Sequence, residues 1–298
     1  MLDFFTNKRY IIINADDFGI TRTTNQAIFT LLQKNVVTSA SLMVPCAHAH
    51  PAVRLCKSIN KPSIGIHLTL TSVESHNLKP VFRGEHLRTL TTEEGFFPHD
   101  ISEVEKKADP EEVRMELEAQ ITAAISFGLD PTHLDSHAGS IMGLNFDRDF
   151  LEIAFDLCEK FRLPFNLPQR IIEQPFFNDR QKQRFAQRIE SAKRRGILLI
   201  HDLYSLPYQL QAGEDYDGIK REFLKQLQLL GPGITQIVAH PSLVTPEIQA
   251  LTPHYKIREF EFRLFSDPEV VKLMNKEGLE LISWRVVRDL QRSICDNG

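Results

Sequence analysis

The chain has 298 residues, 42% of them hydrophobic and 25% charged, with a formal net charge of −4. This balance is typical of a globular protein with a large core. The acidic net charge argues against a nucleic-acid partner, because such partners select for an excess of Lys and Arg. No apolar run approaches the length of about 20 residues that spans a bilayer, so we also expect no membrane partner.

Cysteine usage and the first residues bear on the cellular compartment. The four cysteines, at positions 46, 56, 158 and 295, form no CxxC pair, which disfavours a zinc knuckle. The first apolar run is short and leads directly into acidic residues, unlike a signal peptide. We therefore expect a cytoplasmic protein with reduced thiols, at least two of them buried.

Apolar, β-branched runs alternate with helical patterns along most of the chain. In chain order, strands are predicted at Tyr10–Ala15, Val37–Val44, Ile64–Leu70, Pro131–His137, Pro164–Leu167, Ile197–Leu203, Ile234–Ala239 and Leu279–Val286. Helical patterns between them are predicted at Thr24–Lys34, Ala47–Ile59, Asp109–Gly128, Asp147–Phe161, Lys182–Arg195 and Asp267–Gly278. The longest of these begins at Asp109-Pro110, a capping Asp followed by Pro at the first helical position.

This alternation implies parallel strands covered by helices. About eight such units in about 280 residues favour a barrel over an open sheet. We expect an α/β fold over residues 1–298 as a single domain: an irregular, TIM-like (β/α) barrel of about seven to eight parallel strands with outer helices. Residues 72–108 interrupt the alternation of predicted strands and helices, and an insertion of that length usually has a function. We interpret it as a loop excursion over the mouth of the barrel.

Ligands of parallel α/β folds bind at the carboxyl ends of the strands. Four predicted strands carry Asp or His there: Asp16 and Asp17 after the first, His67 in the third, His137 after the fourth and His240 after a late one. Two carboxylates after an apolar strand are costly to bury without a cation. An acid and two imidazoles leave open positions for water and substrate, as a catalytic metal requires. The sequence therefore favours a metal site, although one of the two acids could instead cap the next helix.

Other histidines carry weaker signals. His133 and Asp135 share a strand face with His137, and His133 lies deeper, where a hydrogen-bonded core histidine is the simpler interpretation. His201 and Asp202 lie near a strand end, and their place in the pocket is left open. The remaining histidines fall in polar stretches and are expected to be exposed: His48, His50, His76, His86, His99 and His254.

The string NADDFG after the first strand, GIH about 50 residues later and PTHLDSH further on together resemble the YdjC-like carbohydrate deacetylases, which include the chitooligosaccharide deacetylases of bacterial chitobiose operons. VVTSASLMV and a late AHPS also fit, so the resemblance covers nearly the whole chain. It implies an irregular (β/α) barrel with a divalent metal held by Asp17, His67 and His137. It also implies Asp16 as the general base and His240 as its partner in proton transfer.

The chain departs from the family pattern after His137. Family members often continue DSH with further histidines, whereas this chain continues with Ala138-Gly139-Ser140, which puts the identity of the substrate in doubt more than the metal. The resemblance implies Mg²⁺, whereas two imidazole ligands suit Zn²⁺ or Mn²⁺ better.

The activity implied is removal of N-acetyl groups from a small amino sugar or a short chitooligosaccharide. The metal would polarise the acetyl carbonyl, Asp16 would accept a proton from water, and His240 would protonate the departing amine. One alternative is a metal-dependent barrel hydrolase of another bond, such as a phosphoester, for which Arg22, Arg258 and Arg263 could contribute to a phosphate clamp. Another is a sugar-binding protein without catalysis. The sequence names no substrate-binding residue, and it leaves a homodimer open.

Overall fold

The structure, a computed structural model, describes residues 5, 7–73, 75–84, 87–276 and 278–297. Parallel strands form its centre, and their bounds are β1 Arg9–Phe18, β2 Ser39–Leu42, β3 Ile64–Leu68, β4 Leu134–Ser136, β5 Asp202–Ser205, β6 Gly233–Ala239 and β7 Leu279–Leu281. All of their pairings are parallel. The predicted parallel α/β architecture is therefore confirmed.

The strands follow one another in the order β4-β3-β2-β1-β6-β5, with β7 pairing the start of β1. Isolated parallel bridges then join Leu134 of β4 to Phe165, and Phe165 to Leu199 just before β5. These two bridges link the outer strands of the sheet by way of Phe165. The result is the irregular barrel that the sequence predicts.

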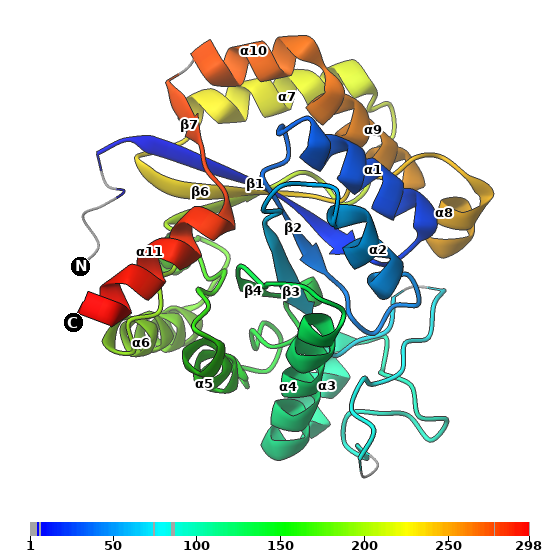
Figure 1. Cartoon of the computed structure of the whole chain (residues 1–298), viewed down its shortest axis with the longest axis vertical. Helices are drawn as coiled ribbons and strands as arrows, with labels where there is room; N and C mark the ends of the chain where they lie inside the picture. Colours follow the sequence, from blue (N-terminus) through cyan, green and yellow to red (C-terminus); the bar gives the residue numbers. More distant parts are fainter. Residues whose placement is uncertain (1–4, 6, 74, 85–86, 277, 298) are drawn as a thin grey trace.

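Helices lie around the outside of the strands (Figure 1). Their bounds are α1 Arg22–Gln33, α2 Ala49–Cys56, α3 Ile101–Lys107, α4 Pro110–Ser126, α5 Leu151–Phe161, α6 Asp179–Arg194, α7 Tyr216–Leu229, α8 Pro246–Leu251, α9 Tyr255–Ser266, α10 Pro268–Lys276 and α11 Trp284–Asn297. Asp109 caps α4 by accepting from the backbone N–H groups of Glu111 and Glu112, as predicted. In the described part of the chain no helix has both the length and the apolar character needed to cross a membrane.

Three predicted strands differ from the structure. The strand predicted at Ile197–Leu203 is observed at Asp202–Ser205, and Leu199 makes only an isolated bridge to Phe165. The run Pro164–Leu167 makes only the single-residue bridges of Phe165, and the run predicted from Leu279 ends as a strand at Leu281. Trp284 instead begins α11, with its backbone N–H donating to Ser39 Oγ and its indole to Gln236 Oε1. The apolar Trp284 is thus buried as part of a helix end, which a short sequence pattern cannot distinguish from a strand.

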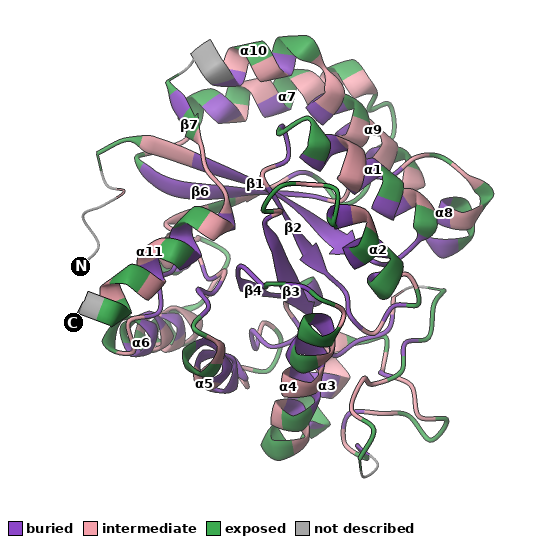
Figure 2. Ribbon diagram, viewed as in Figure 1, coloured by how far each residue is buried: buried purple, intermediate pink, exposed green. Residues whose placement is uncertain are grey.

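Alternating residues of the strands point into the barrel, where they form layers. A small cluster that includes Ile12, Ile200, Ile234 and Trp284 fills the lower interior. Asn14 and Asp16 follow Ile12 on the same face of β1. Polar side chains therefore replace apolar ones toward the carboxyl ends of the strands. Figure 2 shows β1, β2, β3 and β6 as almost entirely buried, whereas β5 and β7 are only partly so.

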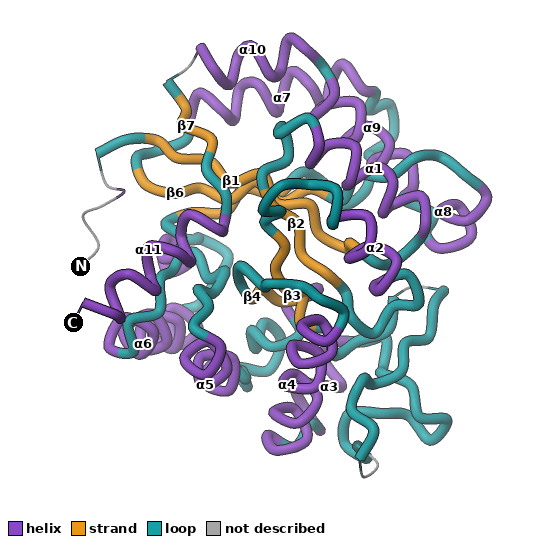
Figure 3. The backbone as a smooth tube through the Cα atoms, viewed as in Figure 1, coloured by secondary structure: helices purple, strands orange, loops and turns teal. Residues whose placement is uncertain are grey.

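The described part of the excursion predicted at residues 72–108 is mostly loop and ends with the short α3 (Figure 3). Its middle is fastened to α4, where Glu116 accepts from the backbone N–H groups of Val81 and Phe82, and Glu112 accepts from that of Thr89. Among its described residues, those that line the cleft at the mouth of the barrel are Ser72 and Val73 at its start and His99 and Ile101 toward its end. That residues 1–298 form one domain stays a prediction.

Candidate active site

A cleft of about 620 Å³ opens at the carboxyl ends of the strands. It is lined by Asp16, Asp17, His67, Thr71, Ser72, Val73, His99, Ile101, Asp135, Ser136, His137, Ala138, Gly139, Leu144, Asn166, Leu203, Tyr208, Val238, His240 and Arg258. The five residues that the sequence singles out, Asp16, Asp17, His67, His137 and His240, all line it. A volume of this size suits a small organic ligand.

Both adjacent aspartates reach the cleft because β1 is irregular at that point. The pairing of β1 with β2 changes register between Ala15 and Phe18, and Asp17 adopts a left-handed conformation with φ of 62°. Such a bulge turns a side chain that would otherwise face the other side of the sheet. β1 therefore runs three residues further than predicted, through both acids.

Hydrogen bonds of the Asn25 side chain, on α1, hold the turn after Asp17 in place. Asn25 Oδ1 accepts from the Gly19 N–H at 2.7 Å, and Asn25 Nδ2 donates to the His48 carbonyl at 3.0 Å. Gly19 has φ of 104°, and a Cβ there would lie 3.0 Å from the Ala49 backbone. A side chain at position 19 would therefore disturb the segment that carries both acids.

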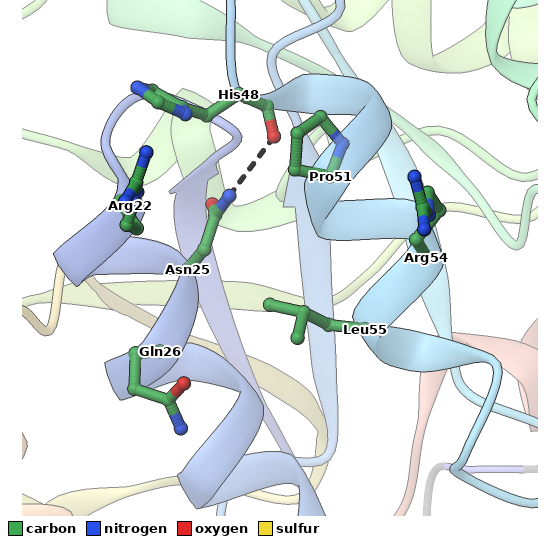
Figure 4. Close-up of a pocket in the computed structure, with 7 residues that line it drawn as sticks. All are labelled: Arg22, Asn25, Gln26, His48, Pro51, Arg54 and Leu55. Carbon is green, nitrogen blue, oxygen red and sulfur yellow. Dashed lines mark hydrogen bonds between the residues drawn. The ribbon is translucent and has the colours of Figure 1, made fainter.

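A second hollow, of about 500 Å³, lies on the outer surface between α1 and α2 (Figure 4). It is lined by Arg22, Asn25, Gln26, His48, Pro51, Arg54 and Leu55. Neither an Asp nor a Glu is among these lining residues, so the hollow offers no acid–base pair. The cleft at the barrel mouth, whose lining includes both Asp and His, is therefore the candidate active site.

Asp17 lies among three cationic or potentially cationic groups. Arg258 Nη2 donates to its Oδ2 at 2.7 Å, while its Oδ1 faces His137 Nδ1 at 3.6 Å and His67 Nε2 at 3.9 Å. Although burial disfavours the charge, Arg258 and His137 hold the pKa of Asp17 well below its usual range. Asp17 is thus a carboxylate with one oxygen tied to Arg258 and the other turned toward two imidazoles.

Asp16 is held by neutral donors instead. Its Oδ1 accepts from Asn14 Nδ2 at 2.6 Å and from Ser41 Oγ at 3.2 Å, and its Oδ2 lies 3.8 Å from His67 Nε2. Burial raises the pKa of Asp16 to about 7, against the attraction of His67. A carboxylate with a pKa in this range is suited to accept a proton near neutral pH.

His67 is oriented by Asp135, two residues before His137. His67 Nδ1 lies 2.9 Å from Asp135 Oδ1, which leaves Nε2 to face the two aspartates. Burial acts to lower its pKa, but the carboxylates of Asp135 and Asp16 raise the pKa of His67 to about 9. A cation that binds Nε2 must therefore displace a proton.

His133 is a core histidine, as expected. It is fully buried, its ring stacks on Trp284 at 4.6 Å, and its Nδ1 lies 3.1 Å from Thr132 Oγ1. A Cβ on Gly65 would meet its ring at 2.3 Å. Glycine at position 65 therefore makes room for this ring.

His240 lies at the edge of the cleft beside Tyr208, with ring centroids 5.2 Å apart. Burial and the nearby Arg258 outweigh the attraction of Asp17 and lower the pKa of His240 to about 3. Its backbone N–H donates to the buried carboxyl of Glu261. His240 is therefore a neutral imidazole at neutral pH in the absence of other ligands.

Two groups of side chains could hold a metal ion among the described residues: Asp17, His67 and His137, and Asp16, His67 and Asp135, with donor atoms within 4.8 Å of one another in each. In the second group, Asp135 is already bonded to His67 Nδ1. In the first, His67 Nε2 and Asp17 Oδ1 both face the same space. A carboxylate and two imidazoles fit a catalytic divalent ion, and the bond from Asp135 to His67 is the support that such a ligand usually has.

Sequence reasoning missed several residues in or next to the cleft. Glu261 of α9 does not line the cleft but accepts a hydrogen bond from the backbone N–H of His240, and no local signal marks it. Arg258, also on α9, is expected from the sequence only as a candidate for a phosphate clamp and not as the partner of Asp17. Asn166 lies near the end of the predicted strand Pro164–Leu167, so the strand-end argument could have found it, whereas Tyr208 lies in a loop. His201 does not line the cleft: its Nδ1 accepts from the Ile234 N–H, and Asp202 is paired with Arg170.

The remaining expectations on His and Cys can be compared with the structure. His50, His76 and His99 are exposed and His48 and His254 are half-buried, while His86 lies outside the described residues. The cysteines are free thiols, with Cys46, Cys56 and Cys158 buried and Cys295 exposed. The expectation of at least two buried thiols is confirmed.

Burial raises the pKa of Glu261 to about 8, which predicts a loss of stability toward alkaline pH. The folded protein retains a proton that the unfolded chain has already lost above pH of about 4.5, so stability falls as pH rises toward about 8. Between pH 6 and 8, Glu261 accounts for roughly 2–3 kcal/mol of this fall. We expect the thermal midpoint of metal-free protein to fall over this range, and to fall less in Glu261→Gln, which can still accept from His240.

The matched control is Glu259→Gln, on the same helix but partly exposed, which should retain the wild-type slope. The raised pKa values of Asp16 and His67 act in the same direction as that of Glu261. The lowered pKa values of three buried or nearly buried histidines act in the opposite direction below about pH 7: those of His133, His137 and His240. The difference in slope between wild type and Glu261→Gln therefore isolates the contribution of Glu261. Equal slopes in wild type and Glu261→Gln would show that Glu261 is ionised throughout.

Comparison with known proteins agrees with this geometry. Residues 10–276 match the model of the family described as YdjC-like protein. The chain is 30% identical over 287 residues to a carbohydrate deacetylase of Thermus thermophilus, covering 95% of each chain. It is 27% identical over 285 residues to one of Thermoanaerobacter pseudethanolicus, covering 94% of this chain and 100% of the relative.

Solved structures show the same fold. A suggested cellobiose-phosphate cleavage protein of Enterococcus faecalis V583 has a TM-score of 0.75 at 24% identity, covering 94% of this chain and 99% of its own. An uncharacterized protein of Agrobacterium tumefaciens C58 has a TM-score of 0.51 at 11% identity, covering 94% and 89%. With the family model spanning residues 10–276, the chain belongs to the YdjC-like protein family.

Proposed function

We propose that this protein is a metal-dependent hydrolase that removes N-acetyl groups from small amino sugars or short chitooligosaccharides. One observation carries the proposal: Asp17, His67 and His137 meet in a single cleft with Asp16 and His240 beside them. The relatives named carbohydrate deacetylases support the same assignment.

Asp17, His67 and His137 would hold one divalent ion. When bound, the ion supplies Lewis acidity that polarises the acetyl carbonyl and makes water more acidic. Family resemblance favours Mg²⁺, whereas two imidazoles favour Zn²⁺ or Mn²⁺. Arg258 keeps Asp17 charged and turns one of its oxygens toward the histidines, and Asp135 keeps His67 Nε2 facing the same space.

Asp16 would act as the general base. Asn14 and Ser41 occupy its Oδ1, which leaves Oδ2 to accept a proton from the attacking water. Arg258 Nη1 is buried and has no hydrogen-bond partner among the described residues, so it is available to donate to the developing oxyanion. A donor prearranged in a buried site stabilises that charge more than water does.

His240 would deliver a proton to the departing amine, since an amide anion is a very poor leaving group. With a pKa of about 3 in the ligand-free protein, His240 begins the reaction neutral. It must therefore gain its proton during turnover. The proton that Asp16 takes from the attacking water would pass to His240 and then to the amine nitrogen as the C–N bond breaks, which leaves acetic acid and the free amine and restores both side chains. The place of His240 at the edge of the cleft, beside Tyr208, supports this role.

A phosphoester substrate is the rival assignment. Phosphoryl transfer is usually assisted by Lys or Arg clamps or by a second metal. Among the described residues that line the cleft, Arg258 is the one Arg or Lys side chain, and it is paired with Asp17. Arg22 lies at the outer hollow and Arg263 lies against Tyr216, so neither joins a clamp. A sugar-binding protein without catalysis would leave Asp16 and His240 without a role.

The test is hydrolysis by the full chain loaded with Mg²⁺, Mn²⁺ or Zn²⁺. The panel comprises N-acetylglucosamine, its phosphates, chitooligosaccharides of two to four sugars, and p-nitrophenyl phosphate. We expect acetate release from at least one neutral N-acetylated sugar and no phosphate release. Phosphate release without acetate would favour the rival, and sugar binding without either product would favour a binding protein. Cytoplasmic location and homodimer formation stay predictions.

A further inference from the structure

The mouth of the barrel divides into two arcs with different chemistry. Going round from β6 through β1, β2 and β3 to β4, the strand ends carry His240, both aspartates, His67 and His137. The rest of the ring runs from β4 through the Phe165 bridge to β5 and back to β6. This second arc contributes Asn166, Leu203 and Tyr208 to the cleft and no acid or histidine.

Asn166 lines the cleft and carries a side-chain hydrogen-bonding group that is unused among the described residues. Its backbone N–H donates to the Leu134 carbonyl, which fixes the residue at the end of the bridging segment. Its side-chain Oδ1 is buried and has no hydrogen-bond partner among the residues that the structure describes. A buried carbonyl oxygen without a partner costs free energy that a donor from a ligand would recover.

Tyr208 presents an aromatic face. It is 65% exposed although it is one of the largest apolar side chains of the cleft. Its ring lies against His240 with centroids 5.2 Å apart and planes inclined by 53°, which ties it to the residue beside which the amine would leave. An exposed ring that lines a cleft, next to the apolar Leu203, suits the C–H face of a sugar.

We propose that Asn166 and Tyr208 form the sugar-binding subsite of this cleft, with the sugar ring lying on Tyr208 and one of its hydroxyl groups donating to Asn166 Oδ1. This inference rests on the proposed deacetylase function. The acetyl carbonyl belongs at the Asp17, His67 and His137 group, and the sugar is joined to it through the amine next to His240. The sugar must then extend over the second arc, because the first is occupied by the acid–base and metal-ligand candidates.

This arrangement makes two different predictions for the two residues. Tyr208 contributes the apolar area of its ring and no specific hydrogen bond to the sugar. Tyr208→Phe should therefore bind sugar as tightly as wild type, and Tyr208→Ala should bind it more weakly. Asn166 offers a specific acceptor, and a site built to bond a hydroxyl rejects the analogue that lacks it. Wild type should therefore prefer the parent sugar to the deoxy sugar that lacks the bonded hydroxyl. This preference should disappear when Asn166 is replaced.

The experiment measures kcat and KM for N-acetylglucosamine, its 3-, 4- and 6-deoxy forms and its dimer. We expect Tyr208→Ala to raise KM roughly 10-fold or more with a smaller change in kcat, as loss of an aromatic contact does. We expect wild type to lose roughly 10-fold or more in kcat/KM on one deoxy sugar, and Asn166→Ala to treat that sugar and the parent alike. Phe176→Ala and Asn60→Ala, exposed residues that do not line the cleft, are controls.

Calorimetric titration of the full chain with the N-acetylglucosamine dimer separates this inference from the proposed function. Weaker binding in Tyr208→Ala and Asn166→Ala than in wild type and the controls would support the subsite even without acetate release. Wild-type turnover with unchanged KM in Tyr208→Ala, or deoxy-sugar discrimination that persists in Asn166→Ala, would overturn the subsite and leave the function standing. Absence of any sugar binding by wild type would overturn it as well.

Discussion

Replacing His137 by Ala is expected to remove both bound metal and acetate release. His137 Nδ1 faces Asp17 Oδ1 at 3.6 Å and its ring lies 5.2 Å from that of His67, so its loss leaves one imidazole and one carboxylate. We expect metal affinity to fall by at least about 100-fold, since even residues that only support a ligand are worth 10–100-fold. Metal content after dialysis, measured by atomic emission, and acetate release check this.

The matched control is His50→Ala, because His50 is exposed on α2 and does not line the cleft. It should keep metal and activity. His137→Ala protein that keeps a full equivalent of metal would place the ion elsewhere, with the Asp16, His67 and Asp135 group as the next candidate.

Asp16→Asn and Asp17→Asn are both expected to lose activity, but for different reasons. Asn at position 16 keeps the volume but cannot act as a base, so this variant should retain metal and sugar binding and lose roughly 10²–10⁴-fold in kcat. Asn at position 17 gives up the charge that Arg258 and the two histidines surround, so this variant should lose metal as well as activity.

Bound metal and kcat measured on both variants decide between the two acids. The two roles are exchanged if metal falls in Asp16→Asn and survives in Asp17→Asn. A metal-replete and fully active Asp16→Asn enzyme would eliminate the general-base role altogether.

The strand-end residues could be found from the sequence because parallel strands bring their carboxyl ends to one edge. Period-two alternation placed His133, Asp135 and His137 on one face, and the structure has His133 packed on Trp284 in the core and His137 in the cleft. The irregularity at Asp17 could not be located by this reasoning. It depends on a left-handed backbone at an aspartate, a conformation that residues other than glycine seldom adopt.

The sequence could not predict which residues come near the site through tertiary packing. Arg258 is 241 positions from its partner Asp17, and Glu261 is 21 positions from His240, from whose backbone N–H it accepts a hydrogen bond. The end of the chain shows the converse limit: Trp284 is buried because it packs on His133 as part of a helix. An apolar run records burial, and it does not say whether the buried element is a strand or a helix.

Acetate release by chelator-treated protein, measured as one divalent metal is added back, tests the central claim most directly. The substrate is the N-acetylated sugar on which the wild-type chain is most active. We predict negligible release without metal and recovery that saturates near one equivalent per chain, with no recovery in His137→Ala. Full acetate release from metal-free wild-type protein, or equal recovery in wild type and His137→Ala, would contradict a metal-dependent deacetylase centred on Asp17, His67 and His137.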